Sequence, residues 1–152
     1  MLECTFCKIV KGKLPSYALY ENENVLAFAP LKEGTIARGH MLLIPKKHYV
    51  DIYEIPNNEL YHMLDAVKII SSRLKDRYNS EGINIIHASG KAAQQSCFHF
   101  HFHLIPRYKN DNLDTWPKTG YKEDNFPEVY REIKDLFQTS RCFANPMTKV
   151  GE

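Results

Sequence analysis

The chain has 152 residues, of which 43% are apolar and 25% are charged, and its formal net charge is +2. This length suits one ordinary domain, and the composition is that of a globular protein able to bury a core. The weak positive charge argues against a nucleic-acid partner held by electrostatics alone. No apolar run approaches the ~20 residues that span a bilayer, and the N-terminus lacks a secretion-signal pattern. We therefore expect a cytoplasmic protein without a membrane partner.

The first half of the chain predicts three short strands followed by a long helix. A helical turn is expected over 6–10, and strands over 17–20, 25–28 and 41–44. Asn57 is placed to cap a helix that ends near Tyr78. Its apolar positions follow helical spacing and are expected in the core: Leu60, Met63, Leu64, Val67, Ile70 and Leu74.

The second half predicts two more strands, over 83–87 and 98–105, and a second helix over 127–137. Strands with mostly short connections and one long intervening helix predict an α+β fold. We expect residues 1–152 to form a single domain, with a core at about 4–108 and a C-terminal extension over 109–152. Four apolar residues of the second helix are expected to face inward: Val129, Ile133, Leu136 and Phe137.

Three histidines alternate with large apolar residues in the fifth predicted strand. Side chains on a strand point alternately to opposite faces, so one set should enter the core and the other should line a polar face. The core set is Phe98, Phe100, Phe102 and Leu104, and the polar set is His99, His101 and His103. Such a row of imidazoles favours metal ligation or nucleophilic and acid–base catalysis. The outer two would lie about 13 Å apart, so one tetrahedral zinc ion cannot bind all three.

The four cysteines divide into a close pair and two isolated residues. Cys4 and Cys7 have the C-x-x-C spacing of half a zinc site or of a redox pair. Cys97 is expected to act as a small buried apolar residue, and Cys142 is given no role.

Several motifs together resemble the histidine triad (HIT) family, in its zinc-bearing, largely bacterial form. The alternating run leads into Ile105-Pro106-Arg107, and Gln95-Ser96 precede it. The segment 39–48, Gly-His-Met-Leu-Leu-Ile-Pro-Lys-Lys-His, is similar to another family motif, and the C-x-x-C pair is a third match. The resemblance implies a five-stranded antiparallel sheet with one long and one C-terminal helix, and a homodimer.

The resemblance also implies roles for individual residues. A closed structural zinc site falls on Cys4, Cys7, His48 and His99; the alternative is a reduced pair without metal. The resemblance assigns to His101 the role of the nucleophile that attacks the α-phosphorus of a nucleotide derivative. It makes His103 a donor near the phosphate and His40 an orienting residue. Contacts to the nucleotide and its phosphate fall on Asn84, Gln95 and Ser96.

The chain departs from the family pattern at two places. Pro30 stands where many members have an aspartate that holds the ribose. The loop that follows is about two residues longer than in the family motif. Glu33 could replace that acid if the loop folds inward. Gln94 stands where a glycine is common before the Gln-Ser pair.

Three functions are consistent with this sequence. The first is a nucleotide hydrolase or nucleotidyl transferase that cleaves a nucleoside phosphoramidate, a dinucleoside polyphosphate or a related conjugate through a nucleotidyl-histidine. The second is a zinc-stabilised nucleotide-binding regulatory module with little turnover. The third is a metallohydrolase that uses His101 and His103 as ligands.

Overall fold

The computed structural model describes residues 4–116 and 126–138 of the chain. Residues 1–115 and 116–152 form two compact units. The first unit contains a five-stranded antiparallel sheet and the long helix α2 (Asn57–Tyr78), and the second contains α3 (Phe126–Gln138). This architecture confirms the predicted α+β fold class. Cys142 lies outside the described residues.

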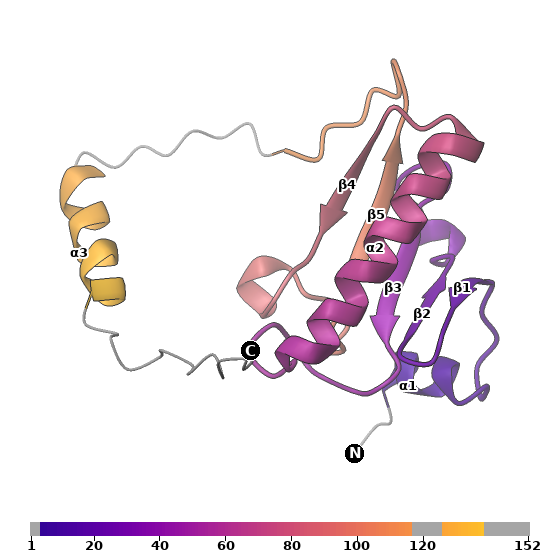
Figure 1. The fold of residues 1–152 in the computed structure, drawn as a ribbon, viewed down its shortest axis with the longest axis horizontal. Coiled ribbons are helices and arrows are strands. Elements are labelled where there is room, and N and C mark those ends of the chain that lie inside the picture. The colour runs from indigo at the N-terminus through magenta and orange to yellow at the C-terminus, as the bar shows by residue number, and fades with distance from the viewer. Residues whose placement is uncertain (1–3, 117–125, 139–152) are drawn as a thin grey trace, which may run out of the picture. The chain divides into compact units, whose positions relative to one another are not determined.

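The sheet has the strand order β1-β2-β3-β5-β4, and each neighbouring pair is antiparallel (Figure 1). The order places β5 between β3 and β4, so His103 lies inside the sheet rather than at its edge, and His99 and His101 immediately precede this strand. The strands are β1 (Ala18–Glu21), β2 (Val25–Phe28), β3 (Met41–Pro45), β4 (Gly82–Ile86) and β5 (Phe102–Arg107).

Helix α2 crosses one face of the sheet and buries a narrow apolar stripe against it (Figure 1). It ends at Asn79, which adopts a left-handed conformation with φ 54° while its amide N–H bonds the Leu74 carbonyl. The predicted position of Leu64 was wrong, because this side chain is 52% exposed. The buried stripe instead includes Ala66, whose small side chain lets the helix approach the strands closely, and Leu64 lies outside it. The core on this face comprises Val25, Ala27, Leu43, Ile55, Met63, Ala66, Val67, Ile70, Leu74, Phe100 and Leu104.

The opposite face of the sheet is partly covered by the short helix α1 (Thr5–Val10). Phe6 of α1 packs with four strand residues, Leu26, Phe28, Leu42 and Ile44. Cys97 is half-buried against this cluster, in agreement with the expected apolar role. The sheet therefore has apolar contacts on both faces, and α1 lies on the face that carries the histidines.

The fifth strand begins four residues later than predicted, at Phe102. The backbone bends over 97–99, and Phe98 is 42% exposed instead of buried. Alternation along a strand fails at such a bend, because successive residues no longer point to opposite faces. Just before β5 the backbone bonds to a residue outside the strands, because the Phe100 amide donates to the Tyr49 carbonyl at 2.6 Å.

The second predicted helix is present, but its apolar residues are not inward. Ile133, Leu136 and Phe137 are 41%, 66% and 79% exposed, and Val129 is half-buried. Within the described part of residues 116–152, α3 is the one regular element. No helix among the described residues is long and apolar enough to cross a membrane.

Candidate functional site

Two cysteines and two histidines converge at the end of the sheet where α1 lies. Their ligand atoms, one each from Cys4, Cys7, His48 and His99, all lie within 4.8 Å of one another. Cys4 precedes α1 and Cys7 lies in its first turn, while His48 follows β3 and His99 precedes β5. Three separate segments therefore bring together the residues that the family resemblance assigned to zinc.

The spacing of these atoms fits tetrahedral coordination. A tetrahedral zinc ion with ordinary bond lengths holds its nitrogen ligands about 3.3 Å apart and a sulfur and a nitrogen about 3.6 Å apart. Nδ1 of His99 lies 3.2 Å from Nδ1 of His48 and 3.6 Å from Sγ of both Cys4 and Cys7. The fourth separation, from Cys7 Sγ to His48 Nδ1, is 3.3 Å. The cluster could hold a metal ion.

The protonation of His99 also suits a metal ligand. Its Nε2 donates to the carbonyl of Pro45 at 2.9 Å, so the proton sits on Nε2 and Nδ1 presents a lone pair to the cluster. Burial lowers the pKa of His99 to about 4, which keeps the ring neutral. Cys97 lies beside the cluster but is not a member of it. Burial raises the pKa of its thiol to about 12, with Cys4 adding to the shift, so Cys97 stays protonated.

His101 lies on the same face as the cluster and presents a free ring nitrogen. The side chain is 4% exposed, and its Nδ1 donates to the main-chain carbonyl of His99 at 2.7 Å. A carbonyl oxygen accepts and never donates, so Nδ1 carries the proton and Nε2 has the lone pair. Phe6 meets the ring edge-on at 5.4 Å between centroids and limits its rotation. Burial lowers the pKa of His101 and keeps the imidazole neutral.

His40 and His103 form a second pair on this face. The Ile36 amide donates to Nδ1 of His40 at 3.2 Å, and Nε2 of His40 lies 3.0 Å from Nδ1 of His103. In the neutral pair the proton between the rings is therefore on His40, and His103 carries its own proton on Nε2. Burial lowers the pKa of both residues, to about 4 for His103, where His101 and His40 add to the shift. The pair can offer one N–H donor to a bound group.

The loop 89–96 is tied together by the side chain of Gln95. Its Oε1 accepts from the Gly90 amide at 2.7 Å, and its Nε2 donates to the carbonyls of Val50 at 2.7 Å and Cys97 at 3.2 Å. Gln95 is 5% exposed, so its side chain shapes the loop and has no free donor for a phosphate. Ser96 is an exposed residue of the same loop.

Two positions in this loop adopt left-handed backbone angles, Gly90 with φ 84° and Gln94 with φ 67°. A glycine reaches this region without cost, whereas a side-chain residue is strained there. Gln94 therefore keeps the conformation that the common glycine allows, at some local cost in stability.

Asn84 of β4 lies on the histidine face, diagonal to His103. It pairs with Ile105 across the ladder, and Ile86 pairs with His103. Nη1 of Arg107 donates to Oδ1 of Asn84 at 2.7 Å. Arginine has no acceptor, so this bond fixes the amide orientation, and the NH₂ group is the part of the Asn84 amide that can donate to another group.

Arg107 is itself held by Asp111. Two parallel bonds join the guanidinium to the carboxylate, at 2.7 Å from Nε and at 2.8 Å from Nη2, and Nη2 also donates to the Leu113 carbonyl. The Arg107 guanidinium lowers the pKa of Asp111 well below its usual range. Asp111 thus positions Arg107, and Arg107 positions Asn84.

No carboxylate enters the site from the loop after β2. Glu33 is exposed on the short helix η1 (Lys32–Gly34), and Pro30 precedes that helix. The predicted substitution of Glu33 for the ribose-binding aspartate requires an inward loop, which the described conformation does not have.

His87 is a residue of this region that the sequence reasoning missed. It follows β4, and its Nδ1 donates to the main-chain carbonyl of His101 at 2.9 Å. The signal was a further histidine two residues before the loop 89–96, directly after the strand that pairs with β5.

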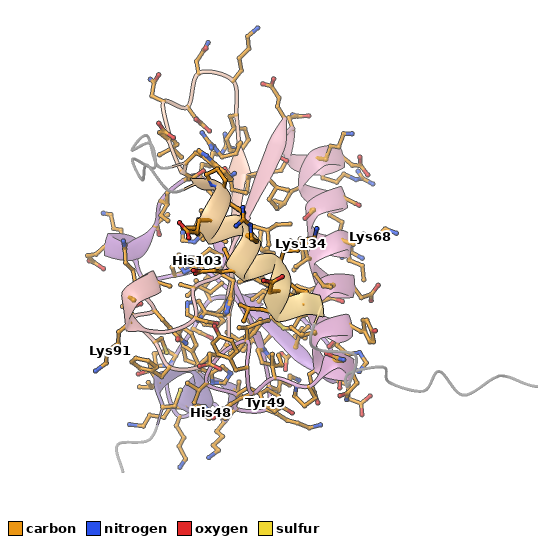
Figure 2. The ribbon with its side chains drawn as sticks, turned by 90° about the vertical axis from the view of Figure 1, so that its left-hand side faces the viewer. His48, Tyr49, Lys68, Lys91, His103 and Lys134 are labelled. Atoms are coloured by element: carbon orange, nitrogen blue, oxygen red, sulfur yellow. The ribbon has the colours of Figure 1, made fainter. Side chains whose placement is uncertain are left out.

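The Cys/His cluster and the His40–His103 pair lie at different positions along the sheet. In Figure 2, His48 and Tyr49 lie at one end of the sheet, and His103 lies farther along it. An apolar hollow of about 380 Å³ opens elsewhere, between α2 and the first strands, and none of the site histidines lines it. The candidate site is therefore the histidine face of the sheet and not this hollow.

Comparisons with known proteins agree with this geometry. A model of the HIT domain matches residues 11–110. The chain is 39% identical to Protein hit of Bacillus subtilis over 131 residues, covering 86% of this chain and 88% of that protein. It is 34% identical to the adenosine 5'-monophosphoramidase HNT1 of Candida albicans, covering 87% and 90%.

The chain belongs to the HIT family. Solved structures show the same fold: SMU.412c from Streptococcus mutans matches with a TM-score of 0.77 and 33% identity over 91% of this chain and 86% of that one. A zinc-bound histidine triad protein from Mycobacterium smegmatis matches with a TM-score of 0.69 and 31% identity over 91% and 98%. The HIT-like fold and the family resemblance of the sequence are thereby confirmed.

Proposed function

We propose that this HIT protein hydrolyses or transfers the nucleotidyl group of a nucleoside phosphoramidate, a dinucleoside polyphosphate or a related conjugate, with His101 as the nucleophile. The observation that carries the proposal is the hydrogen bond from His101 Nδ1 to the His99 carbonyl. It fixes the tautomer in which Nε2 has a lone pair, and burial keeps the ring neutral. The phosphoramidase activity named for the Candida relative supports the substrate class.

The first step forms a bond from His101 Nε2 to the α-phosphorus and breaks the bond from phosphorus to the leaving group. The departing amine or phosphate leaves with the electron pair of that bond. The Nε2–H of His103 donates a hydrogen bond to the departing atom, and a departing amine takes its proton from water, which becomes hydroxide. His40 supports the donor through the 3.0 Å contact. The His99 carbonyl stabilises the cationic imidazole that results, because it accepts the Nδ1 proton in a hydrogen bond.

The second step regenerates the enzyme with water. Water, or the hydroxide formed in the first step, adds its oxygen to phosphorus as the bond to His101 Nε2 breaks, and the proton that an attacking water loses goes to solvent. The products are a nucleoside monophosphate and the free imidazole. Splitting the reaction at a covalent intermediate replaces one difficult displacement by two easier ones.

The nucleotide contacts assigned to Asn84, Gln95 and Ser96 are proposed in different roles. Asn84 donates its NH₂ group to the nucleotide, because Arg107 occupies its oxygen. Gln95 holds the shape of the loop, and the main-chain amides and the Ser96 hydroxyl of that loop face the phosphate.

We also propose that the metal of the Cys4, Cys7, His48 and His99 cluster is zinc in a structural role. Two thiolates and two neutral imidazoles complete four-coordination, which leaves no position for a substrate. When bound, the ion joins α1 to the strand ends. In the described residues this is the one group of three or more potential ligands, which disfavours the metallohydrolase that would use His101 and His103.

A homodimer is proposed as the assembled form. β4 is an edge strand of the sheet and carries Ile85, which is 47% exposed. An exposed apolar edge gains stability by pairing with a second copy. Light scattering should give twice the chain mass of 17.7 kDa at micromolar concentration, and a mass of one chain would contradict the proposal.

The alternative function, a nucleotide-binding module with little turnover, is favoured by one observation. Pro30 and the exposed Glu33 leave the described site without the ribose carboxylate. Rapid quench after mixing with a nucleoside phosphoramidate labelled at the α-phosphorus separates the two. Label on His101 after peptide mapping, formed and lost at the turnover rate, supports the hydrolase. Tight binding of the nucleotide without label on any residue would favour the module.

A further inference from the structure

His87 lies behind the sheet with respect to the imidazole of His101. Its ring stacks on Phe100 at 4.2 Å and 30°, and meets Phe102 edge-on at 5.8 Å and 78°. Both phenylalanines pack with the core under α2, whereas His101 contacts Phe6 on the opposite side. His87 therefore cannot meet a substrate on the histidine face.

From this position His87 still reaches the main chain of His101. The β4–β5 ladder ends at the pair Ile86 and His103, so the carbonyl of His101 lies beyond the last ladder pair. Nδ1 of His87 donates to that carbonyl at 2.9 Å and takes the place of a strand amide. A buried carbonyl without a partner would lower the stability of the native state.

The other nitrogen of His87 is also bonded. Its Nε2 lies 2.6 Å from Oγ of Ser89, which in turn accepts from the Ile52 amide at 3.0 Å. Because the His101 carbonyl only accepts, Nδ1 carries the proton and Nε2 accepts from the Ser89 hydroxyl. Ser89 begins the loop 89–96, so the chain of bonds joins this loop to the main chain of His101.

We propose that His87 is a positioning residue for His101, which holds the main chain of the nucleophile from the opposite face of the sheet. This inference rests on the proposed function. The ring of His101 is fixed relative to the local backbone by its bond to the His99 carbonyl, and His87 fixes that backbone. The two bonds together give Nε2 one direction toward the phosphorus. A displacement of about 1 Å at a reacting group lowers the rate about a hundredfold.

Two substitutions of His87 test the contribution of its N–H donor separately from that of its aromatic ring. His87→Phe keeps an aromatic ring against Phe100 and removes the donor, whereas His87→Asn drops the ring and keeps an N–H donor close to the position of Nδ1. His62→Phe is the matched control, because His62 is exposed on α2. Ser89→Ala leaves His87 in place and removes the partner of Nε2.

The measurement is the single-turnover rate with an α-labelled nucleoside phosphoramidate, together with the ¹⁵N signals of the His101 ring. We expect His87→Phe to lower the rate about tenfold to a hundredfold with little change in KM, and to broaden or shift the His101 signals. His87→Asn should restore most of the rate, Ser89→Ala should lower it about threefold to tenfold, and His62→Phe should leave it unchanged.

Two results would overturn the positioning role. One is a wild-type rate and unchanged His101 signals in His87→Phe. The other is an equal loss in His87→Asn and His87→Phe, which would show that the donor is not what matters. If the wild-type protein forms no nucleotidyl-His101, the proposed function fails, and the response of the His101 signals alone decides the role of His87.

Discussion

Nε2 of His40 lies 3.0 Å from Nδ1 of His103, and the Ile36 amide occupies the other nitrogen of His40. The amide can only donate, so it sets the tautomer of His40, and His40 sets that of His103. A main-chain group on the loop before β3 thereby determines which nitrogen of His103 carries its proton.

His40→Phe should therefore lower kcat more than it raises KM. The phenyl ring cannot donate to Nδ1 of His103, so the proton of His103 is no longer held on Nε2. His40→Gln keeps an N–H donor and should retain more activity. The loss in His40→Phe is expected to be about tenfold or more, the usual scale for one misplaced acid–base group. Equal rates in the two variants would contradict the relay.

His101→Ala should abolish turnover while the metal content and the melting temperature stay close to those of the wild type. The side chain forms the bond to phosphorus in the proposed mechanism and is not one of the cluster ligands. His103→Ala should slow the reaction less, by about a hundredfold, because it supplies a hydrogen bond to the leaving group and no covalent bond. Rapid quench and metal analysis on the same preparations test both. Wild-type turnover in His101→Ala would end the assignment.

Asn84→Ala should raise KM about fivefold and change kcat little, since one hydrogen bond to the nucleotide is lost in the ground state and the transition state alike. Arg107→Met should have a similar effect without touching the ligand, because Asn84 loses the bond that orients its amide. Steady-state kinetics on both variants provide the measurement. A drop in kcat with unchanged KM would show that Asn84 acts on the chemistry instead.

Local patterns predicted most of the fold because the elements bury regular faces. The short apolar runs of β2 and β3, and the helical spacing in α2, correspond to elements of the structure. The same rule failed at Phe98, where a bend interrupts the strand, and at Leu64, where the contact between helix and sheet is narrower than the apolar stripe. The apolar side chains of α3 were predicted to face inward and are mostly exposed, because helical spacing groups residues on one face without determining what that face contacts.

The sequence allowed us to predict which residues form the site better than what each of them does there. The cluster of Cys4, Cys7, His48 and His99 was assigned from the family resemblance, and the structure brings the four together. The structural use of Gln95 was missed, because its partners are main-chain atoms of Val50 and Cys97, which no side-chain motif records. His87 was missed for the same reason, since its partner is the carbonyl of His101.

The free energy of unfolding should fall as the pH is lowered from 7 to 5, in part through His103. Burial lowers its pKa to about 4 in the folded protein, below the ordinary value of 6.5. Between these two values the unfolded chain binds more protons than the native chain, so stability is present above 6.5 and is lost as the pH falls. The slope of the free energy of unfolding against pH measures this difference in bound protons. His103→Gln should lower that difference by up to about one proton. Urea unfolding at both pH values measures it, and an equal slope in the two proteins would contradict the assignment.

Cys7→Ser should release the metal and lower the melting temperature by about 10 °C or more, because a closed site contributes its binding free energy to folding. Cys97→Ser is the matched control. Its thiol lies beside Cys4 and stays protonated, so its loss should leave the metal content unchanged. Elemental analysis of protein purified without chelators should give about one zinc per chain in the wild type and in Cys97→Ser, and little in Cys7→Ser. Full zinc content in Cys7→Ser, or none in the wild type, would contradict the four-ligand site. Because His99 joins this cluster to the main chain that holds His101, the rate of nucleotidyl transfer should fall in Cys7→Ser by less than in His101→Ala.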